Sequence, residues 1–147
     1  MQCMNEFVST PASLWLRLLA GAYDLLPLLG LWFLAGAIAL GLSGGTLEAH
    51  PELRKLLTQA LVLGFTAAYF VISWARGGQT VGMRAWRLRV TRADGAAVDW
   101  RRALLRFGVA LISVAALGTG FAWALFDSRK RTWHDLAADT VLLKRPS

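Results

Sequence analysis

The sequence predicts an all-α membrane protein with three hydrophobic helices, a small cytoplasmic β-hairpin or sheet, and a short C-terminal interfacial helix. Hydrophobic residues make up 56% of the 147 residues, and the mean hydropathy is +0.46. Three runs carry no charge, namely residues 25–47, 56–75 and 107–126. About 20 apolar residues form a helix that crosses a hydrocarbon core of about 30 Å, and a helix satisfies its own backbone groups in lipid.

The charge and composition argue against two other classes of protein, disordered basic chains and soluble basic proteins. The chain carries 16 Lys and Arg against 9 Asp and Glu, a net charge of +7. A disordered basic chain would be poorer in Leu, Val and Trp, and a soluble basic protein would be less apolar. The length suits one domain, which we expect over residues 12–145, with residues 1–11 as a flexible tail. The N-terminus lacks the basic region of a secretory signal, so we expect the first helix to remain as an anchor.

The first two helices follow from the apolar runs and their ends. The first is predicted over residues 14–42, with its membrane part at about 17–42, and Ser43-Gly44-Gly45 ends it. The second starts near Glu52 or Leu53, with Pro51 placed to initiate it, and crosses at about 55–75.

Residues 76–106 form a basic connection with eight arginines and two aspartates. The alternation over residues 86–91 predicts a strand with Trp86 and Leu88 on one face and arginines on the other. Asp94-Gly95 indicates a turn, so a hairpin with residues 96–98 as the return is expected. Asp99 is placed to cap a helix that starts at Trp100.

The third run, with its membrane part at about 104–126, is consistent with two courses. If it crosses fully, Lys and Arg divide nine inside against seven outside; if it re-enters at Gly118-Thr119-Gly120, they divide fourteen against two. Residues 132–138 are predicted to form a short helix, and residues 140–144 a strand that pairs with 86–91. Such pairing needs both segments on one side, whereas the length of the run is normal for one crossing. In both cases, residues 76–106 are expected to be cytoplasmic.

Arg17 and Asp24 lie seven residues apart and therefore share one face of the first helix. Arg17 can reach the headgroups, but Asp24 is too short to do so. An Asp at a helix centre costs about 2.5 to 3.5 kcal/mol, so Asp24 needs a partner. Two interpretations stay open: a functional carboxylate, or an interfacial residue that pairs with an arginine and orients the helix.

The segment Thr132-Trp133-His134-Asp135 fits a capping box, in which Asp135 closes the helix N-terminus. A functional role for Asp135 is the alternative. Asp135 and Asp139 are four residues apart and could face one cation, but too few ligand-type residues surround them for a metal site. His134 either titrates near neutral pH or is a hydrogen-bonded interfacial residue. We expect no metal and no cofactor.

The arginines of the connection have a simple interpretation as contacts to anionic lipid headgroups. A nucleic-acid-binding patch is the alternative, but no nucleic-acid motif is present and we expect no such partner. No nucleophile, zinc or phosphate-loop signature appears either, so we expect no enzymatic activity. The headgroup contacts are assigned to Arg87, Arg89, Arg101 and Arg102.

Several motifs occur together in an order that resembles the RDD family of small bacterial integral membrane proteins. That family is named for one arginine and two aspartates, which the resemblance places at Arg17, Asp24 and Asp135. Met83-Arg84 stand where members often carry Lys, so Arg84 is expected to take that basic role. The motifs are Arg17 to Asp24, the supporting loop Gln79, Thr80 and Gly82, then Asp94-Gly95, Arg102 to Arg106, and His134-Asp135 followed by Thr140.

The resemblance implies a protein of the bacterial inner membrane, and transport of an ion or small ligand has been suggested for the family. In the first hypothesis, a homo-oligomer or a partner protein completes a path in which Asp24 carries a proton or cation. Arg17 or a loop arginine would be its counter-charge, and Asp135 and His134 would gate or relay. In the second, the chain is a non-transporting assembly or regulatory module, and Arg17, Asp24 and Asp135 form a structural polar network.

Overall fold

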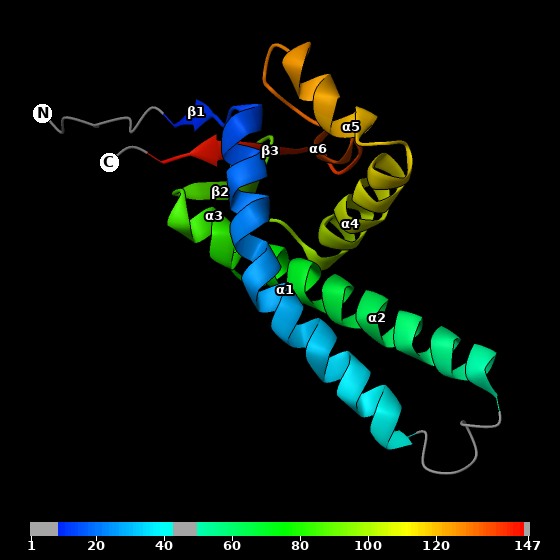
Figure 1. The fold of residues 1–147 in the computed structure, drawn as a ribbon. Coiled ribbons are helices and arrows are strands. Elements are labelled where there is room, and N and C mark those ends of the chain that lie inside the picture. The colour runs from blue at the N-terminus through cyan, green and yellow to red at the C-terminus, as the bar shows by residue number, and fades with distance from the viewer. Residues whose placement is uncertain (1–8, 43–49, 146–147) are drawn as a thin grey trace, which may run out of the picture.

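The computed structural model describes residues 9–42 and 50–145 (Figure 1). Most of the chain is helical, and three short strands from separate parts of it form one small sheet. The elements are β1 (Thr10–Pro11), α1 (Leu14–Leu42), α2 (Pro51–Gly77), α3 (Val81–Ala85), β2 (Leu88–Arg92), α4 (Trp100–Ala115), α5 (Thr119–Ala122), the 3-10 helix η1 (Trp123–Leu125), α6 (Trp133–Ala137) and β3 (Thr140–Lys144).

Helices α1 and α2 are both long and apolar enough to cross a membrane. Pro51 initiates α2, as predicted, and the helix starts there rather than at Glu52 or Leu53. The glycines expected to end α1 lie outside the described residues. Trp32 donates its indole N–H to Thr66 at 2.8 Å, which joins the two helices. Most residues of both apolar stretches are not covered by the rest of the chain.

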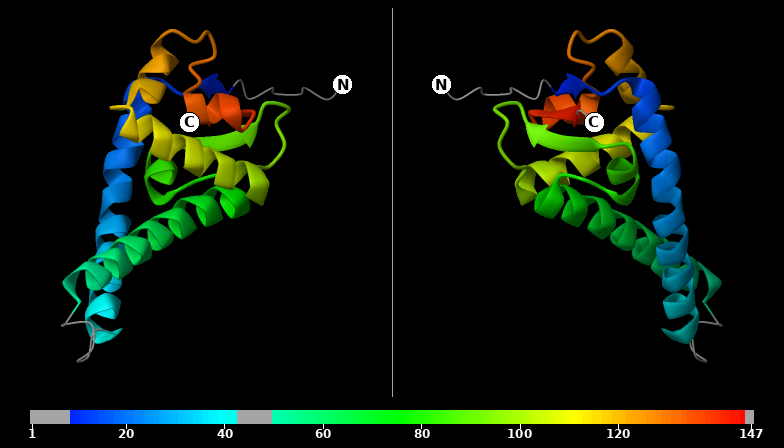
Figure 2. Two further views of the ribbon diagram at one scale, coloured as in Figure 1. Left: turned by 90° about the vertical axis from the view of Figure 1, so that its right-hand side faces the viewer. Right: turned by 90° about the vertical axis from the view of Figure 1, so that its left-hand side faces the viewer.

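The two long helices diverge, and the other elements fill the opening between them. Figure 2 shows α3, α4 and the sheet in this space, with α4 lying across it. The core forms here because apolar side chains from α1, α2, α4 and the sheet meet. Its buried members include Ala20, Val71, Trp74, Leu88, Val90, Ala103 and Leu142.

The sheet has the order β1-β3-β2, and both pairings are antiparallel. The predicted pairing of residues 140–144 with the earlier strand is confirmed, with Leu88 opposite Lys144. The expected hairpin with residues 96–98 is wrong. A turn does form, with Gly95 at φ +85° and the Arg92 N–H bonded to the Ala96 carbonyl at 2.9 Å, but β3 is the partner of β2. β3 offers five paired positions, which a three-residue return could not match.

Two boundaries also differ from the predictions. The strand starts at Leu88, because Trp86 caps the end of α3 and Arg87 has φ +56°. Thr10 and Pro11, which we expected in a flexible tail, pair with β3. Residues 1–8 of that tail lie outside the described part of the chain.

The third apolar run is not one straight helix. The cap by Asp99 is confirmed, with its side chain accepting from the Arg102 N–H at 3.3 Å. α4 then ends at Ala115, and α5 leaves it at an angle of 108°. Leu117 (φ +57°) and Gly118 (φ +76°) make the turn, next to the predicted break.

Candidate functional site

Asp24 is buried between α1, α2 and α3, with only 2% of its surface exposed. Oδ1 accepts from the Tyr69 hydroxyl and from the Gly82 backbone N–H, both at 2.7 Å. Oδ2 accepts from the Thr80 hydroxyl at 2.6 Å. Both carboxylate oxygens therefore have short hydrogen bonds, and all three donors are neutral.

The two hydroxyls are themselves held by backbone amides of α3. The Val81 N–H donates to the Tyr69 hydroxyl, and the Met83 N–H donates to the Thr80 hydroxyl, each at 3.2 Å. Each hydroxyl accepts one bond and directs its own hydrogen to Asp24. The first three amides of α3 thus converge on one carboxylate, which caps α3 from another helix. We call this arrangement the Asp24 cap.

The loop before α3 has the residues that this close approach needs. A Cβ added to Gly82 would collide with the backbone carbonyl of Ala20, so only glycine lets α3 reach α1. Gly78 has φ +66°, and a Cβ there would come within 2.6 Å of the Val90 carbonyl oxygen. Gln79 donates to the Leu88 carbonyl at 2.6 Å and ties the loop to β2.

Arg17 does not pair with Asp24, contrary to one of our expectations. Its Nη1 donates to Asp135 Oδ2 at 2.7 Å, and its Nη2 donates to the Lys130 carbonyl at 2.7 Å. Arg17 and Asp24 do share the buried face of α1, as predicted. They belong to two separate clusters, because Arg17 meets the C-terminal segment and Asp24 meets α2 and α3.

Asp135 is fully buried between two arginines. Arg106 Nη1 bonds Asp135 Oδ1, and it also donates to the Thr140 hydroxyl at 2.8 Å. The guanidinium of Arg106 lies 4.9 Å from the centre of the Trp74 ring. The predicted capping role of Asp135 is present as well, because Oδ2 accepts from the Thr132 N–H at 3.1 Å. We call Arg17, Asp135 and Arg106 the charge triad.

Arg106 and Tyr69 are site residues that the sequence does not single out. Arg106 lies at the end of the basic connection, where contact with headgroups is the general expectation, but it is only 1% exposed. The spacing of Ala103, Arg106 and Ser113 is the sequence pattern that assigns Arg106 to a buried helix face. These residues recur at helical intervals and are the buried residues of α4, so small side chains mark the face to which the arginine belongs.

The comparison with family models decides the identity. The model of the RDD family matches residues 11–139, which include α1 through α6. The chain belongs to the RDD family. No curated protein and no solved structure matches the chain. Membership of the RDD family and the two long apolar helices fit an integral membrane protein.

In this RDD protein, the arginine and the two aspartates do not form one site. Arg17 and Asp135 belong to the charge triad, and Asp24 belongs to the Asp24 cap. Both clusters are anchored on α1, seven residues apart, and both lie in the interior of the chain. One connects α1 with α4 and α6, and the other connects α1 with α2 and α3.

The charge triad changes the titration of two groups on α6. Burial alone would raise the pKa of Asp135, but Arg106 and Arg17 outweigh it and hold that pKa below its usual range. Burial, and then the charge of Arg106, lower the pKa of His134 to about 3. His134 hydrogen-bonds the Thr132 hydroxyl at 2.8 Å and packs on Phe121. The lowered pKa favours the neutral imidazole at physiological pH.

Of the other predicted residues of the RDD protein, Arg84 lies near the Asp24 cap, where its charge acts on the Tyr69 hydroxyl. Arg84, Arg87 and Arg101 are exposed, and Arg89 and Arg102 are half-buried. Asp139 is exposed with φ +51°, so it does not share a site with Asp135 as the spacing had suggested. Within residues 9–42 and 50–145, no three His, Cys, Asp or Glu side chains gather as a metal site.

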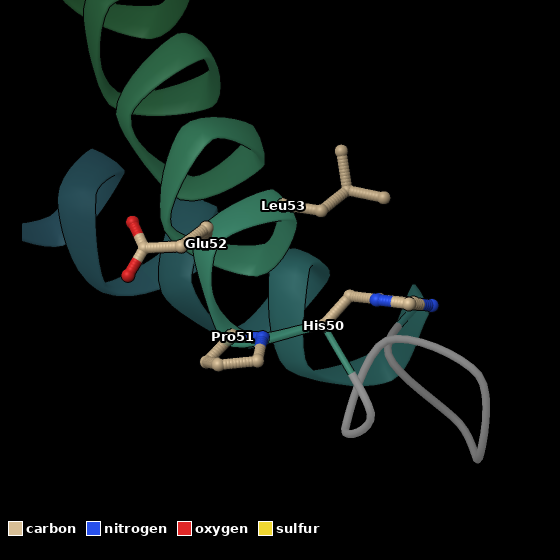
Figure 3. A pocket seen from close by; sticks show the side chains of 4 residues that line it. All are labelled: His50, Pro51, Glu52 and Leu53. Atoms are coloured by element: carbon tan, nitrogen blue, oxygen red, sulfur yellow. The ribbon is translucent and has the colours of Figure 1, made fainter.

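The described surface hollows are not at the clusters. One of about 410 Å³ lies at the start of α2, where Figure 3 shows Glu52 on the opposite side of the helix from Leu53. Another of about 400 Å³ lies beside the start of α4, next to Arg101, Arg102 and Asp139. Neither is lined by Asp24 or Asp135.

Proposed function

We propose that this RDD protein is a non-transporting assembly or regulatory module of the bacterial inner membrane. Its polar clusters fasten two membrane helices to a cytoplasmic part made of the sheet, α3 and α6. The observation that carries this proposal is the state of Asp24, both of whose carboxylate oxygens accept short hydrogen bonds. A carrier carboxylate must exchange its partners during each cycle, whereas Asp24 is held by three donors on two elements.

The proposed orientation places all three strands of the sheet in the cytoplasm. β3 is hydrogen-bonded to both β1 and β2, so the segments before α1, after α2 and after α6 share one side of the membrane. With α1 and α2 as the crossings, fourteen Lys and Arg lie on that side and two on the other. Lys and Arg favour the cytoplasmic side, so residues 76–106 are assigned to it. The exposed arginines of this connection would contact anionic headgroups.

Transport is a second candidate, favoured by one specific observation. Within the described residues, Asp24 has no ion pair, although it lies between two apolar helices. A proton or a cation could neutralise such a charge. Two helices enclose no path, so this function would require a homo-oligomer or a membrane partner, which would complete the path beside Asp24.

The experiment compares Asp24→Asn with the wild type in two measurements. Asparagine keeps the size of the side chain but turns an amide toward one of the three donors, which leaves that donor unpaired at a cost of about 1 to 3 kcal/mol. We expect a lower unfolding temperature in detergent and a lower folded yield. In reconstituted vesicles, we expect wild-type protein to dissipate imposed proton and sodium gradients no faster than empty vesicles.

Asp94→Asn is the matched control, because Asp94 is an exposed aspartate in the turn after β2. Its unfolding temperature should equal that of the wild type. A wild-type ion flux that disappears in a stably folded Asp24→Asn protein would overturn the structural proposal and establish the transport function.

A further inference from the structure

The sheet restricts how many times the chain can cross a membrane between β2 and β3. Because these strands are paired along their whole length, they lie on one side, and the segment between them crosses an even number of times. That segment contains α4, α5, η1 and α6, and α4 is its longest helix with 16 residues. At 1.5 Å per residue, α4 spans roughly 24 Å, which is less than the hydrocarbon core. The third apolar stretch must therefore turn back.

We propose that α4, α5 and η1 form an apolar arch that inserts into the cytoplasmic leaflet of the bilayer and binds anionic lipid there. The inference rests on the proposed insertion of α1 and α2. It adds a lipid-binding surface to the outward side of a segment whose buried side carries Arg106 of the charge triad.

The exposed residues of the arch are those expected for contact with acyl chains. Leu117 at the turn is 96% exposed, and Phe126 at the end of the arch is 84% exposed. α4 buries Ala103, Arg106 and Ser113 against the protein and turns leucines outward. Further exposed apolar side chains are Leu104, Leu105, Leu111, Ile112, Val114, Trp123 and Leu125. A contiguous patch of this kind in water would promote association, whereas in a leaflet it is solvated.

The charges at the two ends of the arch fit lipid headgroups. Arg101 and Arg102 lie in the first turn of α4, and Arg129, Lys130 and Arg131 follow the arch. Arg102 pairs with Asp99 and Arg131 pairs with Asp127, so each end keeps a net positive charge from its remaining basic residues. Residues 107–126 between them carry no charge. Both ends are thus basic and the middle is apolar, which is the pattern of an interfacial segment on an anionic membrane. A second copy docked symmetrically on this face would bring like charges together, so lipid is the better occupant.

The experiment measures the depth of single labelled cysteines in vesicles. Cys3→Ser removes the one native cysteine, and Leu117→Cys then carries an environment-sensitive fluorophore. Vesicles contain phosphatidylcholine and phosphatidylglycerol, with a spin-label quencher either shallow or deep in the acyl chain. We expect several-fold stronger quenching at residue 117 by the lipid quencher than by aqueous iodide, and more with the shallow quencher than with the deep one.

Two control positions make the outcomes distinguishable. Leu136→Cys on α6 is a partly exposed leucine on the cytoplasmic part, where iodide should quench the label and lipid should not. Phe33→Cys on α1 is 82% exposed and reports insertion of α1 itself. If the label at 33 is quenched by lipid while the label at 117 is quenched by iodide, the arch proposal fails and the insertion of α1 stands. If neither label is quenched by lipid, membrane insertion fails as well.

Two further results at residue 117 would overturn the proposal. Protection from both quenchers would indicate that a second copy or a partner protein covers the arch. Equal quenching in pure phosphatidylcholine vesicles would contradict the role of the basic ends, because these should draw the arch toward anionic lipid.

Discussion

The buried carboxylate of Asp135 contacts two guanidiniums, and each guanidinium is held in place by a different second contact. Arg17 comes from α1 and also binds the Lys130 carbonyl, while Arg106 comes from α4 and lies over Trp74. Charges of this kind are costly to bury, and they are tolerated only when every partner is present. The charge triad is therefore sensitive to the loss of any one member.

Arg106→Met tests this sensitivity. Methionine keeps much of the volume but removes the partner of Asp135 Oδ1 and of the Thr140 hydroxyl. Breaking a buried ion pair costs about 3 to 5 kcal/mol, so we expect the free energy of unfolding to fall by about 3 kcal/mol, measured by chemical denaturation in micelles. Arg101→Met, at an exposed position of the same helix, should change the free energy of unfolding by less than about 0.5 kcal/mol.

The lowered pKa of His134 predicts how the stability of the protein depends on pH. Its pKa is about 3 in the folded protein and 6.5 ordinarily, so acid protonates the unfolded chain first. The contribution of His134 to the free energy of unfolding is complete above pH 6.5. It falls as the pH drops toward 3, by at most about 1.4 kcal/mol per pH unit. Asp135 adds a loss of the same sign, but only below its ordinary value of 3.8.

Unfolding measured between about pH 7 and 5 therefore isolates the histidine. His134→Gln, which cannot be protonated, should show a flatter profile over this range. A wild-type profile as flat as that of the variant would contradict the assignment of a neutral, buried imidazole.

Among the elements, α3 depends most closely on a single glycine. In Gly82→Ala, the new methyl group would collide with the Ala20 carbonyl, so α3 must move away from α1 and the Asp24 cap must open. We expect a loss of at least about 1 to 3 kcal/mol, the usual cost of overpacking. Gly64→Ala in α2 is the control, because no atom lies within 4 Å of its added Cβ. It should be neutral or stabilising in the same thermal unfolding measurement, since alanine favours helix.

Elements that depend on local patterns could be predicted, and contacts between distant elements could not. Charge-free runs located α1 and α2, the cap at Asp99 located the start of α4, and alternation located β2. The convergence of α3 amides on Asp24 has no local signature, because Tyr69 lies within an apolar run and looks like any membrane-interface aromatic. Likewise, an arginine at the end of a basic segment looks solvated until helical spacing assigns Arg106 to the buried face.

At the scale of the whole molecule, the proposed orientation predicts where the ends of the chain lie. Fusions after Lys144 should be fluorescent with a green fluorescent protein and inactive with alkaline phosphatase, because β3 pairs with β2 on the cytoplasmic side. Phosphatase inserted between residues 42 and 51 should be active. An active phosphatase after Lys144 would mean that the third apolar run crosses fully, against the pairing of the sheet.

The position of β3 between β1 and β2 has a consequence for how this protein is made. Neither outer strand touches the other, so no pair of the sheet can form until Thr140–Lys144 has been synthesised. At about 5 to 20 residues per second, the ribosome needs on the order of ten seconds to travel from β1 to β3. During this interval Arg17 is without Asp135, which also lies near the C-terminal end. The nascent chain therefore has two helices ready for the membrane while its cytoplasmic part stays open, the period in which a chaperone or a partner could engage it.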